Sequence, residues 1–257
     1  MDNKIVRAAA RAALALLAAA LICILSACTP EVPDNITTEA PATSSAPREL
    51  EVVSGGKAIY RVVYREGGTA AELEAARAVA KTLGRICSAE VTLASDILMP
   101  GQEYPAEGYD ILVGYTGYPE SRRAYEELSY GSYSVSADGG RIVLAARGDN
   151  EISRTTDEFL SLLTVTGKGD ECRVVFPSDA VRRGTLSDEA AALPMISGGE
   201  YDSVYSTGDG AYMVVVKKAD ADISAAYLAA LAEAGFEERI RHTDEKNVFC
   251  SFEGKGL

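Results

Sequence analysis

The sequence contains one histidine and no tryptophan among its 257 residues. It also lacks the G-x-S-x-G, H-E-x-x-H, G-x-x-x-x-G-K-[ST] and C-x-x-C motifs. These absences argue against an α/β-hydrolase nucleophile elbow, a zinc protease, a P-loop phosphate site and a zinc ribbon. We therefore expect no metal or cofactor. Basic residues are few, since 25 lysines and arginines face 38 acids for a net charge of −13. Nucleic-acid phosphates would be repelled, so no nucleic-acid partner is expected.

One long apolar run is present, at residues 12–25, and it follows a positively charged start. The run is shorter than the roughly 20 residues that a spanning helix needs, and small residues follow it, as in a secretory signal peptide. The L-S-A-C at 25–28 resembles the bacterial lipobox. This resemblance implies that residues 1–27 are removed and that the Cys28 thiol carries a diacylglyceryl lipid. The alternatives are a transmembrane anchor and an ordinary signal peptide with a chance cysteine.

Residues 29–48 are rich in proline, serine, threonine and alanine, with little to bury. Together with Cys28, this composition predicts a disordered linker over 28–48 that tethers a folded part to the membrane. We therefore expect a lipid-anchored protein on the extracytoplasmic face of a cell membrane.

Three cysteines remain in the folded part: Cys87, Cys172 and Cys250. A disulfide between Cys87 and Cys172 is compatible with an extracytoplasmic location. Scattered cysteines are more often small buried hydrophobic residues, and we take that as the expected state.

The mature chain is predicted to hold two small modules, at 49–177 and 193–257, separated by a linker at 178–192. The first alternates strands and helices, with strands expected at 57–66, 90–93, 109–115, 132–136, 141–146 and 172–176, and helices at 69–84, 119–128 and 151–163. Thr69-Ala70-Ala71-Glu72 has the pattern of a capping box. The second module is expected to have strands at 200–205, 211–218, 236–242 and 248–252 around a helix at 222–234. The predicted fold class is α+β (an α/β sandwich), each module having a mixed or antiparallel sheet with helices packed on one face.

Residues 57–163 resemble the small α/β domain that precedes the catalytic barrel in family 20 β-N-acetylhexosaminidases and α-glucuronidases. The resemblance lies in the first strand and helix, in YDILVGYTGYPES at 109–121 and in GSYSVSADGGRIVLAARGDNEISRTTDEFLSLL at 131–163. Arg154 stands where that family often has an arginine, although Thr155 replaces the glycine that commonly follows. A barrel takes about 250 residues, and only 80 follow Pro177, so the catalytic domain of those enzymes has no room here. The resemblance therefore implies a non-catalytic domain.

The second module resembles one that recurs in clostridial surface lipoproteins and hydrolases. That module would add another hairpin arm after Leu257, so we expect this one to be truncated.

Tyrosine is enriched between Tyr104 and Tyr133, and aromatic rings stack on sugar rings. Four of these tyrosines fall at predicted strand ends or loops and are candidate ligand contacts together with Arg154: Tyr115, Tyr118, Tyr130 and Tyr133. The alternative is that these tyrosines are ordinary sheet and interface residues.

The function expected from the sequence is a lipid-anchored, non-enzymatic module that contacts cell-wall or other polysaccharide. Two alternatives stay open: a fragment of a larger cell-surface hydrolase, and a scaffold that binds another envelope protein through an unpaired strand edge.

Overall fold

The structure is a computed structural model that describes residues 49–199, 201–206, 212–243 and 248–254. Within these ranges the fold is mixed α+β, as predicted. No helix in the described ranges is long and apolar enough to cross a membrane. The predicted signal peptide, Cys28 and the linker at 28–48 lie outside the described residues.

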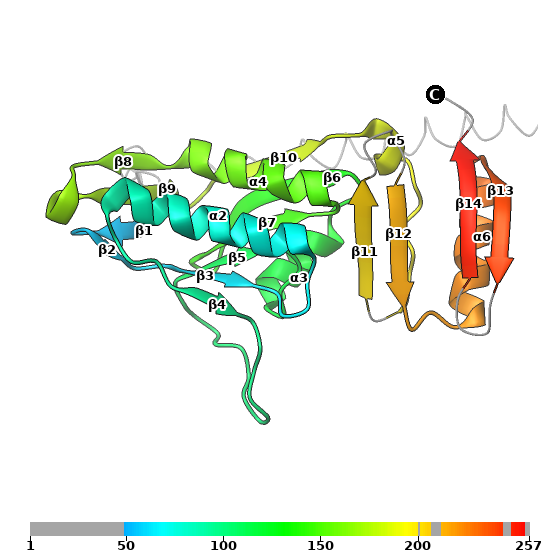
Figure 1. Cartoon of the computed structure of the whole chain (residues 1–257), viewed down its shortest axis with the longest axis horizontal. Helices are drawn as coiled ribbons and strands as arrows, with labels where there is room; N and C mark the ends of the chain where they lie inside the picture. Colours follow the sequence, from blue (N-terminus) through cyan, green and yellow to red (C-terminus); the bar gives the residue numbers. More distant parts are fainter. Residues whose placement is uncertain (1–48, 200, 207–211, 244–247, 255–257) are drawn as a thin grey trace, which may run out of the picture. The chain divides into compact units, whose positions relative to one another are not determined.

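A six-stranded mixed sheet forms the centre of the first module (Figure 1). Its order is β10-β6-β7-β5-β3-β4, in which β7, β5, β3 and β4 are parallel and β6 runs antiparallel to β7 and β10. The strands are β3 (Arg61–Tyr64), β4 (Leu93–Ser95), β5 (Asp110–Val113), β6 (Ser132–Asp138), β7 (Arg141–Ala146) and β10 (Val181–Thr185). All four residues of β5 are buried, as is typical of a central parallel strand.

Helices cover both faces of this sheet, whereas the sequence predicted one covered face. Helices α2 (Ala70–Cys87) and α4 (Asp149–Leu162) contribute to one core cluster, which also contains Val62, Ile111 and Leu144. Helix α3 (Pro119–Glu126) and its flanking residues belong to a separate cluster with the alternate strand positions Val63 and Leu112. Successive side chains of these strands point to opposite faces of the sheet, so both faces of the six-stranded sheet are buried.

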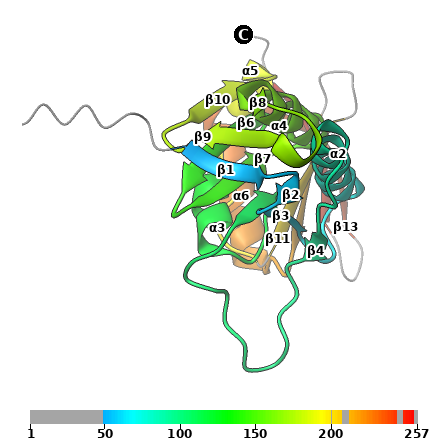
Figure 2. The same cartoon turned by 90° about the vertical axis from the view of Figure 1, so that its left-hand side faces the viewer.

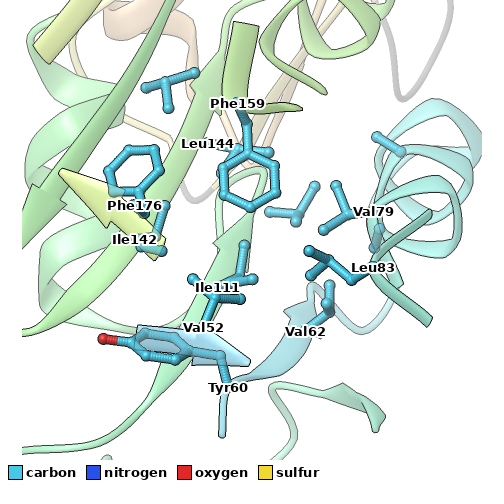
Figure 3. Close-up of a cluster of buried hydrophobic side chains, with 14 of the residues drawn as sticks. Val52, Tyr60, Val62, Val79, Leu83, Ile111, Ile142, Leu144, Phe159 and Phe176 are labelled. Carbon is cyan, nitrogen blue, oxygen red and sulfur yellow. The ribbon is translucent and has the colours of Figure 1, made fainter. Parts of the chain in front are cut away.

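A second, antiparallel sheet shares the core under α2 and α4. It has the order β2-β1-β9-β8, from β1 (Glu49–Ser54), β2 (Lys57–Ala58), β8 (Thr164–Thr166) and β9 (Arg173–Pro177), and the 3₁₀ turn Gly169–Glu171 precedes β9. Phe159 of α4 stacks on Phe176 of β9 with ring centroids 5.7 Å apart (Figure 3). Each fully buried side chain of this size contributes roughly 1.5–3 kcal/mol.

A disulfide joins Cys87, the last residue of α2, to Cys172, which directly precedes β9. Both residues are buried, as expected, but they are bonded to each other rather than independent. Helix α2 passes the predicted end at Gly84 because Ser88, in the left-handed conformation, donates its N–H to the Gly84 carbonyl. Cys250 is free and partly exposed.

The segment at 178–192, predicted as a linker, forms β10 and the short helix α5 (Asp188–Ala191). Strand β10 extends the six-stranded sheet by pairing with β6. The elements that follow agree closely with the predicted ones: β11 (Tyr201–Ser206), β12 (Tyr212–Lys217), α6 (Ala221–Glu233), β13 (Phe236–Thr243) and β14 (Val248–Gly254). They include two hairpins, β11–β12 and β13–β14.

Candidate functional site

The candidate site lies at the carboxyl ends of the parallel strands. At this place the strand order switches, because the next two strands after β3 are added on opposite sides of it. From β3 the chain passes through α2 to β4 on one side, whereas β5 lies on the other side of β3 and leads to α3. In α/β sheets ligands bind at such a switch point, beyond the carboxyl ends of the strands.

A small pocket of about 20 Å³, partly open to solvent, occupies this edge. We call it the edge pocket, and its lining residues come from the loops after β3, β5 and β7, from α2, α3 and α4, and from β11. They are Arg65, Thr69, Glu72, Tyr115, Tyr125, Ala146, Gly148, Asp149, Ile152 and Val204. This volume holds about one water molecule and is far below the roughly 300–1,000 Å³ of a site that encloses a ligand, so a ligand would lie across the opening of the pocket.

The N-terminus of α2 borders the edge pocket, and a carboxylate of the chain occupies it. Glu72 Oε2 accepts a hydrogen bond from the Thr69 N–H at 2.9 Å, while Thr69 Oγ1 accepts one from the Glu72 N–H at 3.2 Å. This is the capping box predicted from the sequence, and it is confirmed. Glu72 Oε1 accepts a third hydrogen bond at 3.0 Å, from the backbone N–H of Tyr115 after β5.

Two glycines make room for glutamates at this edge. Gly114 has a φ of 78°, and a Cβ there would come within 2.3 Å of Glu72 Oε1. A Cβ at Gly148, the N-cap of α4, would come within 2.0 Å of Glu151 Oε2. Glu151 is buried, and its Oε2 atom has no hydrogen-bond partner. The two neighbouring helix N-termini therefore both have a glutamate of the chain packed against them.

Burial dominates the electrostatics of these carboxyl groups. It raises the pKa of Glu72 above the usual value, although the hydrogen bonds from Tyr115 and Thr69 lower it. Burial also raises the pKa of Asp149, although a hydrogen bond with the Thr69 side chain lowers it. The pKa of Glu151 is raised by burial as well. The pocket thus holds carboxyl groups that keep their protons to higher pH than ordinary acids do.

Aromatic rings and guanidinium groups form the other part of the lining. The Tyr115 and Tyr125 ring centroids are 4.5 Å apart, and the Arg65 guanidinium lies 5.2 Å from the Tyr115 centroid. Arg147, which follows β7, stacks on Tyr125 at 3.9 Å. The half-buried Tyr115 is thus the more accessible of the two lining tyrosines, since Tyr125 is buried.

This arrangement suits a ligand with hydroxyl groups better than a phosphate. A helix N-terminus binds anions through its free N–H groups, but here the Glu72 carboxylate already accepts from them. Carboxylates accept hydrogen bonds from hydroxyls, a guanidinium donates to them, and a tyrosine ring can pack against an apolar sugar face.

The structure separates the tyrosines that the sequence grouped as ligand contacts. Tyr115 lines the edge pocket, but Tyr118, Tyr130 and Tyr133 are buried. The Tyr118 hydroxyl accepts from Arg61 Nη2 at 3.1 Å, and Tyr130 packs with Ala190 in a small core cluster. These three rings serve internal packing.

Tyr133 packs against β10, and Arg154 lies on the exposed side of α4. A Cβ at Gly184 would come within 2.5 Å of the Tyr133 ring, so the glycine allows the ring to lie across this strand. Arg154 Nη2 donates to Glu158 Oε1 at 2.7 Å. Tyr133 and Glu158 together raise the pKa of Arg154. Neither Tyr133 nor Arg154 lines the edge pocket.

Sequence reasoning missed Glu72, Asp149 and Arg65 as site residues. Glu72 was identified only as a helix cap, although a capping box that follows a parallel strand is a usable signal for a helix N-terminus at the ligand-binding edge. Among the described residues, no cluster of three or more His, Cys, Asp or Glu could hold a metal ion. No protein-family model matches the chain, and no curated protein matches it either.

Proposed function

We propose that this protein is a lipid-anchored, extracytoplasmic module that binds a saccharide without catalysing a reaction on it. The edge pocket carries this proposal, because it combines a half-buried tyrosine ring with carboxylates and a guanidinium. The resemblance of residues 57–163 to an accessory domain of glycan-processing enzymes supports the same ligand class.

The disulfide and the lipobox support the proposed location. The Cys87–Cys172 bond is of the kind that persists outside the cytoplasm. The L-S-A-C at 25–28 supplies a cysteine whose thiol can form a thioether to diacylglycerol. A serine at this position does not replace the thiol in that chemistry.

The absence of catalysis is proposed from the state of Glu72, the buried acid of the pocket. Both oxygens of Glu72 accept backbone hydrogen bonds, so this carboxylate is engaged in holding the α2 and β5 termini together. A general acid or base must instead be free to reach the proton that it transfers.

Retention of the purified protein on insoluble peptidoglycan tests the ligand class. Tyr115→Ala should reduce the retained fraction by about tenfold, because it removes the ring that would pack on a sugar. Tyr109→Ala is the matched control, since this tyrosine is 64% exposed and lies outside the pocket. No retention, or equal losses in both variants, would remove the saccharide proposal.

Metabolic labelling with palmitate tests the anchor separately. Cys28→Ser should abolish the label and block cleavage before residue 28, while the folded part stays intact. Label and cleavage that persist in this variant would show that Cys28 is not lipidated.

A further inference from the structure

The loop between β4 and β5, residues 96–109, projects from the sheet (Figures 1 and 2). The Gln102 N–H donates to the Met99 carbonyl at 3.0 Å and closes a turn, and we call residues 97–102 the tip of the loop. Ile97 is 69% exposed and Met99 is 67% exposed, which places two large apolar side chains in solvent within three residues. The tip carries no charge from Ile97 to Gln102. Single exposed apolar residues are ordinary, whereas apolar residues gathered on one surface are a signal of an interaction site.

The first limb of this loop is held firmly at its base. The Asp96 carboxylate accepts from the Glu66 N–H at 2.8 Å and from the Gly117 N–H at 2.7 Å. The Tyr104 hydroxyl donates to the Asp96 carbonyl at 3.0 Å and so ties the second limb to the first.

The second limb is held by a fully buried arginine. Arg141 donates to the carbonyls of Pro105 at 2.6 Å and Ala106 at 3.3 Å, and it pairs with Asp110 and Glu120. Desolvating a guanidinium costs free energy. Because the buried Arg141 donates to two carbonyls of the loop, we infer that the second limb has a defined conformation where it joins the sheet. Both limbs of the loop are thus tied to the body of the module, while Ile97 and Met99 stay exposed.

We propose that the tip of this loop inserts into the interface of the bilayer that holds the lipid anchor and thereby orients the edge pocket relative to the membrane. The inference rests on the lipid attachment at Cys28 proposed above. Twenty residues lie between Cys28 and Glu49, and the linker predicted from their composition would have an end-to-end distance of about 25 Å. The proposed lipid attachment therefore keeps the bilayer within reach of the folded part.

Two side chains bury too little surface to recruit a free protein, since even one myristoyl chain gives only marginal binding. They can orient a protein that its lipid already keeps at high local concentration. Glu103 and Glu107 on the returning limb limit contact to the tip, because anionic headgroups repel them. A zwitterionic surface is the matching partner.

The absence of tryptophan makes Met99→Trp a unique fluorescent reporter. The full lipidated chain would be reconstituted into phosphatidylcholine vesicles with and without brominated acyl chains. We expect brominated lipid to reduce the Met99→Trp emission about twofold, as for a side chain at interfacial depth. Val165→Trp on β8, at a site 44% exposed, is the control and should be unaffected. Adding Ile97→Asp to the Met99→Trp chain should abolish the quenching.

Equal quenching at positions 99 and 165 would overturn the proposal. A Met99→Trp signal that neither brominated lipid nor aqueous acrylamide quenches would also overturn it, since protein would then cover the tip. Flotation of the vesicles distinguishes a missing lipid anchor from a tip that is not inserted. A chain that does not float with them lacks the anchor, whereas a floating chain without quenching has the anchor but no inserted tip.

Discussion

Glu72, in the first turn of α2, accepts a hydrogen bond at 3.0 Å from the backbone N–H of Tyr115, 43 residues further along the chain. The same carboxylate caps its own helix through Thr69. One side chain therefore couples a local capping motif to the loop after β5, and it sets the position of the tyrosine that lines the edge pocket.

Glu72→Ala should lower the free energy of unfolding by about 2 kcal/mol, because it removes a cap and leaves the Tyr115 N–H without its acceptor. Urea denaturation followed by circular dichroism measures this change. Glu74→Ala, at an exposed position of the same helix, is the control and should change stability by less than about 0.5 kcal/mol. Equal effects of the two substitutions would contradict the coupling role.

Arg141→Met should destabilise the fold by about 3–5 kcal/mol, since it leaves the buried Asp110 and Glu120 without their shared cation. The exposed Arg123–Asp138 pair gives the comparison, and Arg123→Met should cost less than about 1 kcal/mol. Thermal and urea unfolding of both variants would measure the difference. A small effect at position 141 would mean that the network relaxes or admits water.

Removing the disulfide by Cys87→Ala with Cys172→Ala should destabilise the protein by up to about 4.5 kcal/mol, because the bond closes a loop with a sequence separation of 85. The measurement is the urea midpoint with and without reductant. Cys250→Ala should leave that midpoint and its response to reductant unchanged. If reductant shifts the double variant as much as the natural chain, the bond does not account for the stability.

Glu151→Gln should change how stability depends on pH. Burial raises the pKa of Glu151 in the folded state, so the unfolded chain loses this proton at a lower pH than the folded chain. The group therefore makes the fold progressively less stable as pH rises from its unfolded pKa to its raised folded pKa. At neutral pH the variant should be more stable by on the order of 1 kcal/mol, and the difference should vanish below about pH 4.

Unfolding of the Glu151→Gln variant at several pH values provides the measurement, with the exposed Glu126→Gln as control. A difference that is the same at pH 4 and pH 7 would show that titration of Glu151 is not its cause.

Local patterns in the sequence were sufficient for much of the secondary structure. The capping box at Thr69 and the run YDILVGY at 109–115 predicted α2 and β5 because helix caps and buried strands depend on a few neighbouring residues. Strand β10 was missed because VRRGT carries the charged residues of a solvated edge strand, and only its pairing with β6 orders it.

The sequence by itself determined the α+β class, the order of most elements and the acidic charge. The tertiary structure alone decided the second covered face of the sheet, the Cys87–Cys172 bond and the gathering of Glu72, Tyr115 and Asp149 at one edge. It also buried three of the four tyrosines that composition had marked as ligand contacts. The reason is that periodicity specifies which face of an element is apolar, whereas the partner of that face depends on strand order, which residues distant in the chain determine together.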